Sequence, residues 1–347
     1  MNEKRPNNLS SNYINGNYFV NLDYTGTKVK RALRAGEELS PKFPDSIDLK
    51  ITNKCLNNCP FCHESSNPSG KSFDFNRTVA ILDQLPHVGI EIAIGGGNIF
   101  EIPEDTIKLI EWCESRNFQP RVTVRYSDIQ SQVEILPENE DSPYHGQVKY
   151  KSDRIKKLLD ISHNIGVSLD NYIEDPITEF LGNDSMYYLR RRNQSKYVYH
   201  IIAGLFPLED LKKLLKSKYY DKILILGFKQ FGRARTMNLP EKSLEEWSSY
   251  LKQYLYRSRY LFDGKFKKIV GFDNLAIDQL GIRDCLTKDE WDKLYFGDEF
   301  SSSMYIDAVE EKYAPTSRDL NRVSWSKMNI IDYFNKYRNG YEDKANN

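Results

Sequence analysis

The chain has 347 residues, enough for one large domain or two ordinary ones with a substantial core. Lysine and arginine together number 49, as do aspartate and glutamate, so the formal net charge is zero and there is no strong nucleic-acid signal. No apolar run approaches the roughly 20 residues of a membrane span, and the N-terminal residues lack the apolar core of a signal peptide. We therefore expect a soluble, cytoplasmic protein with no membrane partner.

The first part of the chain predicts a small β-structure. Apolar positions alternate over residues 13–34 on both sides of Thr25-Gly26, which is typical of a β-hairpin or a short meander. Two prolines then separate this segment from the next. We assign residues 1–45 to an N-terminal β-hairpin extension.

From Ser46 onward, short β-branched runs alternate with segments of helical periodicity. Six strands are predicted, over residues 46–52, 90–97, 121–126, 165–171, 196–205 and 222–228. Helices are predicted between them, over residues 76–85, 103–115, 154–162 and 208–219. Parallel strands need a crossover that is usually helical, so this α/β pattern favours parallel βα units over residues 46–233. Six units are too few for the usual closed eight-fold barrel, which leaves a partial, open TIM-like barrel or a doubly wound sheet.

Residues 127–153 are longer than an ordinary connection and follow a predicted strand, on the face where α/β folds place their sites. Two interpretations stay open for them, a lid over the site and a solvated insertion.

Beyond Arg233 the pattern changes to a helix, a strand, a helix, a hairpin and a helix. Capping boxes at residues 243–246 and 287–290 are predicted to open helices, and residues 303–315 are predicted to form the hairpin. No change in composition marks a flexible linker. We therefore predict that residues 234–347 form a C-terminal α/β extension packed on the barrel.

The cysteines carry the clearest chemical signal. Cys55, Cys59 and Cys62 form a C-x3-C-x2-C motif directly after the first predicted barrel strand, and the other two cysteines lie far away. Three thiolates are one short of a closed zinc site or a fully ligated four-iron cluster, so one iron would stay open to another ligand. Zinc with His63 as fourth ligand fits poorly, since adjacent residues rarely reach one tetrahedral ion. A redox dithiol of Cys59 and Cys62 leaves Cys55 unexplained. We therefore expect a [4Fe–4S] cluster.

The stretch "CLNNCPFC", with Phe61 before its last cysteine, resembles the cluster motif of the radical S-adenosylmethionine (radical SAM) enzymes. In that family the motif follows the first strand of a partial (β/α)6 barrel, which is its predicted position here. The resemblance implies that Cys55, Cys59 and Cys62 bind a [4Fe–4S] cluster, with Phe61 beside the cofactors. It also implies S-adenosylmethionine (SAM) as the second cofactor.

A glycine turn at the end of the second predicted strand supports the resemblance. In the family, a glycine-rich turn there presents backbone carbonyls to the amino group of SAM, and here "GGGN" assigns this role to Gly95, Gly96, Gly97 and Asn98. Glycine suits a backbone that must approach a ligand closely. The acidic residue of the family's turn is absent, with Gly97 or Asn98 in its place, so a side-chain carboxylate contact is lost.

Further matches lie at the ends of later strands. Ser168 and Asp170 occupy the region where family members commonly contact the ribose or carboxylate of SAM. Residues 200–205 resemble the stretch that packs on the adenine, and Gly227 and Phe228 could complete that pocket. Ordinary barrel packing is the alternative for each of these residues.

The resemblance implies that one electron from the reduced cluster cleaves SAM to methionine and a 5′-deoxyadenosyl radical, which abstracts hydrogen from a substrate. The implied partner is an electron donor such as flavodoxin or ferredoxin. No residue is assigned as a hydrogen donor. The alternative is a non-enzymatic zinc- or cluster-binding module that has lost turnover.

The substrate is not identified by these motifs. Because no cysteines mark a second cluster of the kind that many peptide-modifying members carry, we favour a small molecule or a nucleotide over a peptide. Arg125, Lys229 and Arg233 lie near predicted strand ends and are candidates to bind an acidic substrate group, or are ordinary ion-pair residues.

Overall fold

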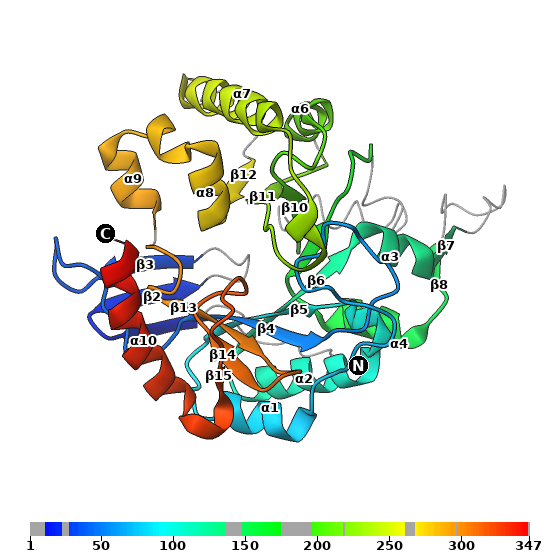
Figure 1. Cartoon of the computed structure of the whole chain (residues 1–347), viewed down its shortest axis with the longest axis vertical. Coiled ribbons are helices and arrows are strands. Elements are labelled where there is room, and N and C mark those ends of the chain that lie inside the picture. Colours follow the sequence, from blue (N-terminus) through cyan, green and yellow to red (C-terminus); the bar gives the residue numbers. More distant parts are fainter. Residues whose placement is uncertain are drawn as a thin grey trace, which may run out of the picture.

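The largest element of the fold is a ten-stranded sheet (Figure 1). The computed structural model of the chain describes residues 11–22, 28–135, 148–174, 196–217, 219–260, 268–295 and 297–345. Across this part of the chain the strand order of the sheet is β12-β11-β10-β9-β6-β5-β4-β13-β14-β15. A separate sheet holds β1, β2 and β3, and a third pairs β7 with β8.

The centre of the large sheet is a run of six strands in chain order, and every neighbouring pair among them is parallel. These strands are β4 (Ser46–Thr52), β5 (Glu91–Gly96), β6 (Gln119–Arg125), β9 (Ile165–Ser168), β10 (Tyr197–Ile202) and β11 (Lys222–Leu226). The expectation of an α/β fold built on a parallel sheet is therefore confirmed.

Helices connect these strands, and their ends follow local capping rules. They are α1 (Phe75–Leu82), α2 (Pro103–Ser115), α4 (Asp153–Ile161) and α6 (Leu208–Lys216). The carboxylate of Asp74 accepts a hydrogen bond from the Arg77 amide at 2.9 Å, and Pro103 opens α2 at a position where proline costs no hydrogen bond. The stripe on α2 that contains Cys113 is buried, so this cysteine is a core residue.

The insertion after β6 begins with α3 (Tyr126–Gln132), followed by the antiparallel pair β7 (Val133–Ile135) and β8 (Val148–Tyr150). Its central part, residues 136–147, lies outside the described residues.

The N-terminal segment forms an antiparallel sheet of β1 (Ser11–Asn15), β2 (Tyr18–Leu22) and β3 (Lys28–Ala32). The expected Thr25-Gly26 turn lies outside the described residues. Charged contacts bind this sheet to the amino ends of β4 and β5. The carboxylate of Asp45 pairs with Lys30 at 3.1 Å and with Lys28 at 3.4 Å, and Lys28 also pairs with Glu91 at 3.1 Å.

Strands that follow residue 234 join both edges of the parallel sheet. On one edge, β12 (Ile269–Phe272) pairs parallel with β11, and on the other, β13 (Ser303–Asp307) pairs parallel with β4. The antiparallel strands β14 (Lys312–Ala314) and β15 (Val323–Ser324) extend the second edge, so the predicted hairpin at 303–315 is confirmed.

The helices of this region are α7 (Glu241–Tyr260), α8 (Asn274–Leu280), α9 (Lys288–Leu294) and α10 (Ile330–Ala345). The capping box predicted at 287–290 is confirmed, because Thr287 and Glu290 exchange side-chain hydrogen bonds with each other's backbone. The one predicted at 243–246 is wrong. α7 begins two residues earlier, and the Ser243 hydroxyl donates to the Gly204 carbonyl at 2.8 Å.

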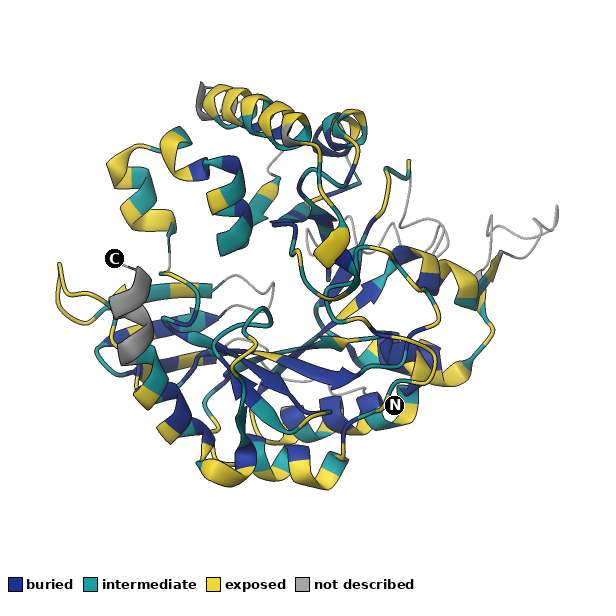
Figure 2. Ribbon diagram, viewed as in Figure 1, coloured by how far each residue is buried: buried dark blue, intermediate teal, exposed yellow. Residues whose placement is uncertain are grey.

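One hydrophobic core runs from Ile47 to Phe334 and includes the strands of the sheet and the inner faces of α1, α2 and α10 (Figure 2). Among the described residues, no helix has both the length and the apolar character needed to cross a bilayer.

We expect Asp45→Ala to lower the free energy of unfolding by about 3–5 kcal/mol, because it removes a buried carboxylate and leaves Lys30 without its counter-charge. Urea unfolding measures this change. The control is Asp292→Ala on α9, whose ion pair with Lys288 is exposed and should contribute less than about 0.5 kcal/mol. Equal losses for the two variants would contradict the role given to Asp45.

Candidate functional site

A cavity of about 800 Å³ lies on the inner face of the parallel sheet and under the loops that follow its strands. The residues that the sequence assigns to the cluster and to SAM all line it: Cys55, Cys59, Phe61, Cys62, Gly95, Gly96, Gly97, Asn98, Ser168 and Asp170. The structure therefore brings every one of these predicted residues to one place.

The cavity exists because the inner face of the sheet carries small or polar side chains. On β5, Ala93 and Gly95 line the cavity while Ile92 lies in the core, and on β9 the lining residues include Gly166 and Ser168. In a closed TIM barrel, bulky branched side chains fill this space. Here their absence from these positions leaves room for ligands.

The loop that carries Cys55, Cys59 and Cys62, here called the cysteine loop, is held in place by hydrogen bonds from Arg233. This arginine lies in the 3-10 helix η2 (Gly232–Thr236), which follows β11. The Arg233 guanidinium donates to the carbonyls of Cys59 at 2.9 Å and Ser66 at 2.6 Å, and its backbone amide donates to the Cys62 carbonyl at 3.0 Å. Gly232 makes this approach possible, since a Cβ there would lie 2.4 Å from the His63 carbonyl oxygen. Arg233 is thus a positioning residue for the loop rather than a free cation for a substrate.

Arg125 connects the cysteines to Asp170. Its guanidinium donates to the Cys59 sulfur at 2.8 Å and to the Asp170 carboxylate at 2.9 and 2.5 Å, and lies 5.8 Å from the centre of the Phe61 ring. Burial raises the pKa of the Cys55 and Cys59 thiols, and the Arg125 charge opposes this rise at Cys59. In the ligand-free protein the Arg125 charge therefore lies beside the Cys59 sulfur.

The first turn of the insertion also contacts the cysteine loop. The Asn57 side-chain amide donates to both carboxylate oxygens of Asp128 in α3, at 2.9 Å each. Both residues line the cavity.

The glycine turn lies against the chain that leads into the cysteine loop. The amides of Gly97 and Asn98 donate to the carbonyls of Thr52 and Lys54, at 2.7 Å each. A Cβ at Gly97 would lie 2.2 Å from the Lys54 carbonyl oxygen, and Gly96 has a φ of +121°, so both positions need glycine. A Cβ at Gly95 would meet nothing within 4 Å.

Asn98 is the last residue of the glycine turn and lines the cavity. Its side-chain oxygen accepts a hydrogen bond from the Phe100 amide at 3.0 Å and caps the short 3-10 helix η1 (Ile99–Glu101). This contact gives the asparagine a local structural role.

On the opposite wall, Ser168 on β9 lies beside His200 on β10. His200 lines the cavity, and its ring occupies space that a Cβ at Gly166 would fill, at 2.3 Å from its Cε1 atom. Burial lowers the pKa of His200 to about 4, so the imidazole is neutral at pH 7. Gly227 and Phe228 line the same cavity.

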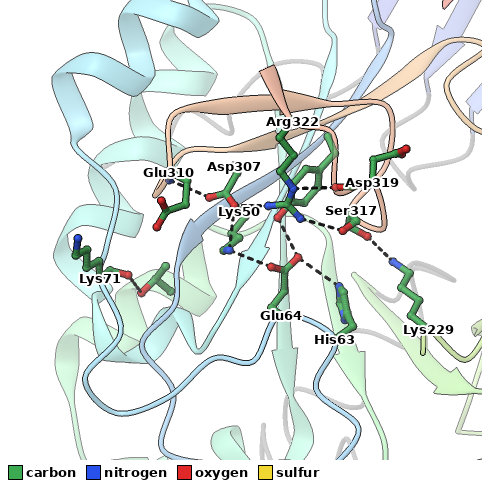
Figure 3. Close-up of polar contacts among 12 residues, drawn as sticks. Lys50, His63, Glu64, Lys71, Lys229, Asp307, Glu310, Ser317, Asp319 and Arg322 are labelled. Carbon is green, nitrogen blue, oxygen red and sulfur yellow. Dashed lines mark hydrogen bonds and ion pairs between the residues drawn. The ribbon is translucent and has the colours of Figure 1, made fainter. Parts of the chain in front are cut away.

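A balanced network of buried charges joins the cysteine loop to the sheet edge at β13 (Figure 3). Lys50 pairs with Glu64 at 3.0 Å and with Asp307 at 3.1 Å, and Asp307 also pairs with Arg322 at 2.5 Å. The Tyr305 hydroxyl donates to Glu64 at 2.9 Å. Sequence reasoning missed this network, because its members come from positions up to 272 residues after Lys50 and carry no local motif.

His63 lies 3.5 Å from Glu64 in this network, and burial lowers its pKa to about 4, with the Lys229 charge adding to the effect. Among the described residues, no group of three or more histidine, cysteine, aspartate or glutamate side chains is arranged to hold one metal ion.

Comparison with solved structures identifies the fold. SuiB of Streptococcus suis, bound to its precursor peptide SuiA, superposes with a TM-score of 0.55 at 13% identity, over 85% of this chain and 65% of SuiB. SuiB bound to S-adenosylmethionine gives a TM-score of 0.54 at 13% identity, over 85% of this chain and 66% of SuiB. SuiB is a radical SAM enzyme. This chain has the fold of SuiB.

The similarity to SuiB is one of fold over part of its length. This chain spans about 65% of the length of SuiB, and an identity of 13% supports the fold alone. The structure of anSMEcpe with bound AdoMet and Cp18Cys peptide is less similar, with a TM-score of 0.47 at 11% identity over 84% of this chain and 79% of that one. No protein-family model and no curated protein matches the sequence.

We expect Arg233→Met to loosen the cysteine loop, because two charge-assisted hydrogen bonds to loop carbonyls are lost. In metal-free protein, the thiols of Cys59 and Cys62 should react with a disulfide reagent at least about tenfold faster, and stability should fall by about 2 kcal/mol. The matched control is Arg235→Met in the same 3-10 helix, where the side chain is exposed. Unchanged thiol reactivity in Arg233→Met would contradict the clamp.

We expect His200 to make the metal-free protein less stable in mild acid. The unfolded imidazole takes up its proton near pH 6.5 and the folded one near pH 4, so the unfolded state holds more protons between these values. The contribution of His200 to the free energy of unfolding is complete above about pH 6.5 and is lost as the pH falls toward 4. The loss should be about 2 kcal/mol after allowance for the open cavity.

Urea unfolding at pH 7, 6, 5 and 4.5 measures this loss, and His200→Gln should reduce the pH dependence by that amount. His87→Gln, at a side chain that is 36% exposed, is the control. An identical pH dependence in wild type and His200→Gln would show that the imidazole is not enclosed as described.

Proposed function

We propose that the protein is a radical SAM enzyme whose Cys55, Cys59 and Cys62 bind a [4Fe–4S] cluster, with SAM beside it. The observation that carries the proposal is that the cysteines and the glycine turn line one cavity in a chain with the fold of SuiB. When bound, the reduced cluster supplies the electron that cleaves SAM and so generates a radical able to take hydrogen from a substrate.

The donor set fits a cluster better than a single metal ion. The three thiols line one cavity, and in a cluster each thiolate binds a different iron, so the sulfurs need not point to a common centre. Arg125 offers a hydrogen bond to the Cys59 sulfur, a contact that stabilises a thiolate ligand. No comparable observation supports the alternative of a zinc-binding module without turnover.

The remaining predicted residues have roles in holding SAM. The carbonyls of Gly95 and Gly96 would receive its amino group, since Gly95 leaves open space beside it. Phe61 and the Arg125–Asp170 pair form a wall next to the cysteines, and Ser168 offers a hydroxyl on the facing strand. Asn98 would act through the turn that it caps rather than through its side-chain oxygen.

The same proposal includes the finer architecture. We infer that β4, β5, β6, β9, β10 and β11 form a partial, open (β/α)6 barrel over residues 46–233, because the cavity lies on their inner face. The boundaries at 1–45 and 234–347 and the electron donor, a flavodoxin or a ferredoxin, stay predictions. Thiolate ligands and a reduced cluster would require a reducing compartment such as the cytoplasm.

Anaerobic reconstitution with iron and sulfide should give about four irons per chain, and dithionite with SAM should then release 5′-deoxyadenosine. Cys59→Ala should lose both the full iron content and the product, whereas Cys285→Ala should keep both. Wild-type protein that holds a complete cluster yet forms no 5′-deoxyadenosine would refute the enzyme and leave the cluster-binding module.

Two neighbouring glycines give a sharper test of the SAM site. Gly95→Ala should fold normally, because its methyl group meets nothing, but should weaken SAM binding at least about fivefold by projecting into the cavity. Gly97→Ala should instead destabilise the fold by about 2 kcal/mol or more, because its methyl group would overlap the Lys54 carbonyl. Equilibrium binding of SAM and urea unfolding separate the two effects. Full SAM affinity in Gly95→Ala would place the methionine end of SAM elsewhere.

A further inference from the structure

Asp48 is a charged side chain of the parallel sheet that has no partner among the described residues. It lies in the middle of β4 and lines the cavity, and its side chain is exposed to the empty space. It has no hydrogen bond or ion pair with any residue that the structure describes. Its neighbours in the sheet are Ala93 on β5 and Tyr305 on β13, and the small side chain of Ala93 leaves the carboxylate accessible.

The other acidic groups near Asp48 all have partners. Glu91 pairs with Lys28 and Arg121, Asp273 accepts hydrogen bonds from backbone amides including that of Gly227 at 2.9 Å, and Glu299 pairs with Arg318. Burial raises the pKa of Asp48, and the Lys229 charge opposes the rise. A carboxylate that faces a cavity and has no partner among the described residues is accessible to a ligand, and its position there indicates a binding role.

Lys229 is the complementary feature. Of the four cations that line the cavity, Lys50, Arg121 and Arg125 each pair with a carboxylate. The Lys229 ammonium donates to the Ser317 hydroxyl at 3.0 Å and has no carboxylate partner among the described residues (Figure 3). It influences Asp48 electrostatically but does not reach it. The cavity thus presents a separated negative and positive group to its contents.

This pair is distinct from the groups assigned to SAM. Asp48 lies four residues before the end of β4, a distance of roughly 13 Å along an extended strand, whereas the cysteine loop follows that end. Its register partner on β5, Ala93, lies two residues before Gly95, the first residue of the glycine turn. The volume of about 800 Å³ is near the upper end of the roughly 300–1,000 Å³ found for sites that hold one drug-sized ligand.

We propose that the cavity binds, beside SAM, a small zwitterionic substrate whose protonated amine pairs with Asp48 and whose acidic group pairs with Lys229 and Ser317. This inference rests on the proposed function, because the bound molecule is a substrate only if the protein is a radical SAM enzyme. The binding itself does not depend on SAM cleavage. Among the substrate classes left open by the sequence, the proposal selects a small molecule that carries both an amine and an acidic group.

The test uses three matched series of probes on the full chain with its cluster reconstituted and no reductant present. The series are ω-amino acids from glycine to 8-aminooctanoate, the n-alkylamines of the same lengths, and the n-alkanoates of the same lengths. Binding is measured by isothermal titration calorimetry. We expect at least one ω-amino acid to bind, the amine of equal length to bind at least about tenfold more weakly, and the alkanoate more weakly still.

Variants assign the two ends of the probe. Asp48→Asn should weaken the ω-amino acid and the amine by about tenfold or more, whereas Lys229→Met should weaken the ω-amino acid but leave the amine unchanged. A structural role is tested by unfolding. Asp48→Asn should keep or raise the melting temperature of the ligand-free chain, because it removes an unpartnered charge, whereas the bonded Asp307→Asn should lower it.

Failure of every ω-amino acid to bind, or unchanged affinity in Asp48→Asn, would overturn the proposal. A lower melting temperature in Asp48→Asn without loss of affinity would make Asp48 a structural residue. A chain that binds the zwitterion but releases no 5′-deoxyadenosine with SAM and dithionite would refute the proposed function and leave this site intact. A chain that releases 5′-deoxyadenosine but binds no ω-amino acid would refute the proposed substrate site and leave the proposed function intact.

Discussion

The unfilled interior of the parallel sheet is the constraint on which the rest of the structure depends. Small residues such as Ala93 and Gly166 on the inner face give up the dispersion contacts that would normally pack this space. The core compensates on the other face, where Ile92 and Val167 are fully buried. The sheet is therefore stabilised from outside, which leaves its inner face free to carry polar groups.

Several charged groups on that face pair with charges from distant parts of the chain. Lys50 on β4 is balanced by Glu64 from the cysteine loop and by Asp307 from β13. Because breaking such a pair leaves an uncompensated buried charge, β13 and the cysteine loop depend on each other. The region after residue 234 is therefore part of the cavity wall as well as of the sheet, since it also supplies Tyr305 and Ser317.

Local signals explain what the sequence could predict. A β-branched run bounded by turn residues predicts β4 with its observed ends, and Pro103 marks the start of α2 because proline is favoured in a first helical turn. The residues predicted to hold cofactors lie together because the carboxyl ends of parallel strands share one edge of a sheet. The pairing of β13 with β4 was not predictable in this way, since it joins strands more than 250 residues apart by backbone hydrogen bonds that leave no local pattern. The hydrogen bonds from Arg233 to the cysteine loop were not predictable for the same reason.

The residues proposed to hold cofactors and those proposed to bind a substrate differ in the sequence signal that they leave. The cysteine loop and the glycine turn are continuous segments, whose spacing is constrained by the group they would hold. Asp48 and Lys229 are single residues, and in "SIDLKIT" an aspartate between apolar neighbours has the alternation of a strand with one face toward water. In this fold, the polar face of that alternation does not lie toward bulk water. Once six strands line a cavity, the face that alternation marks as polar becomes its wall, and a charge on that face is accessible to a ligand.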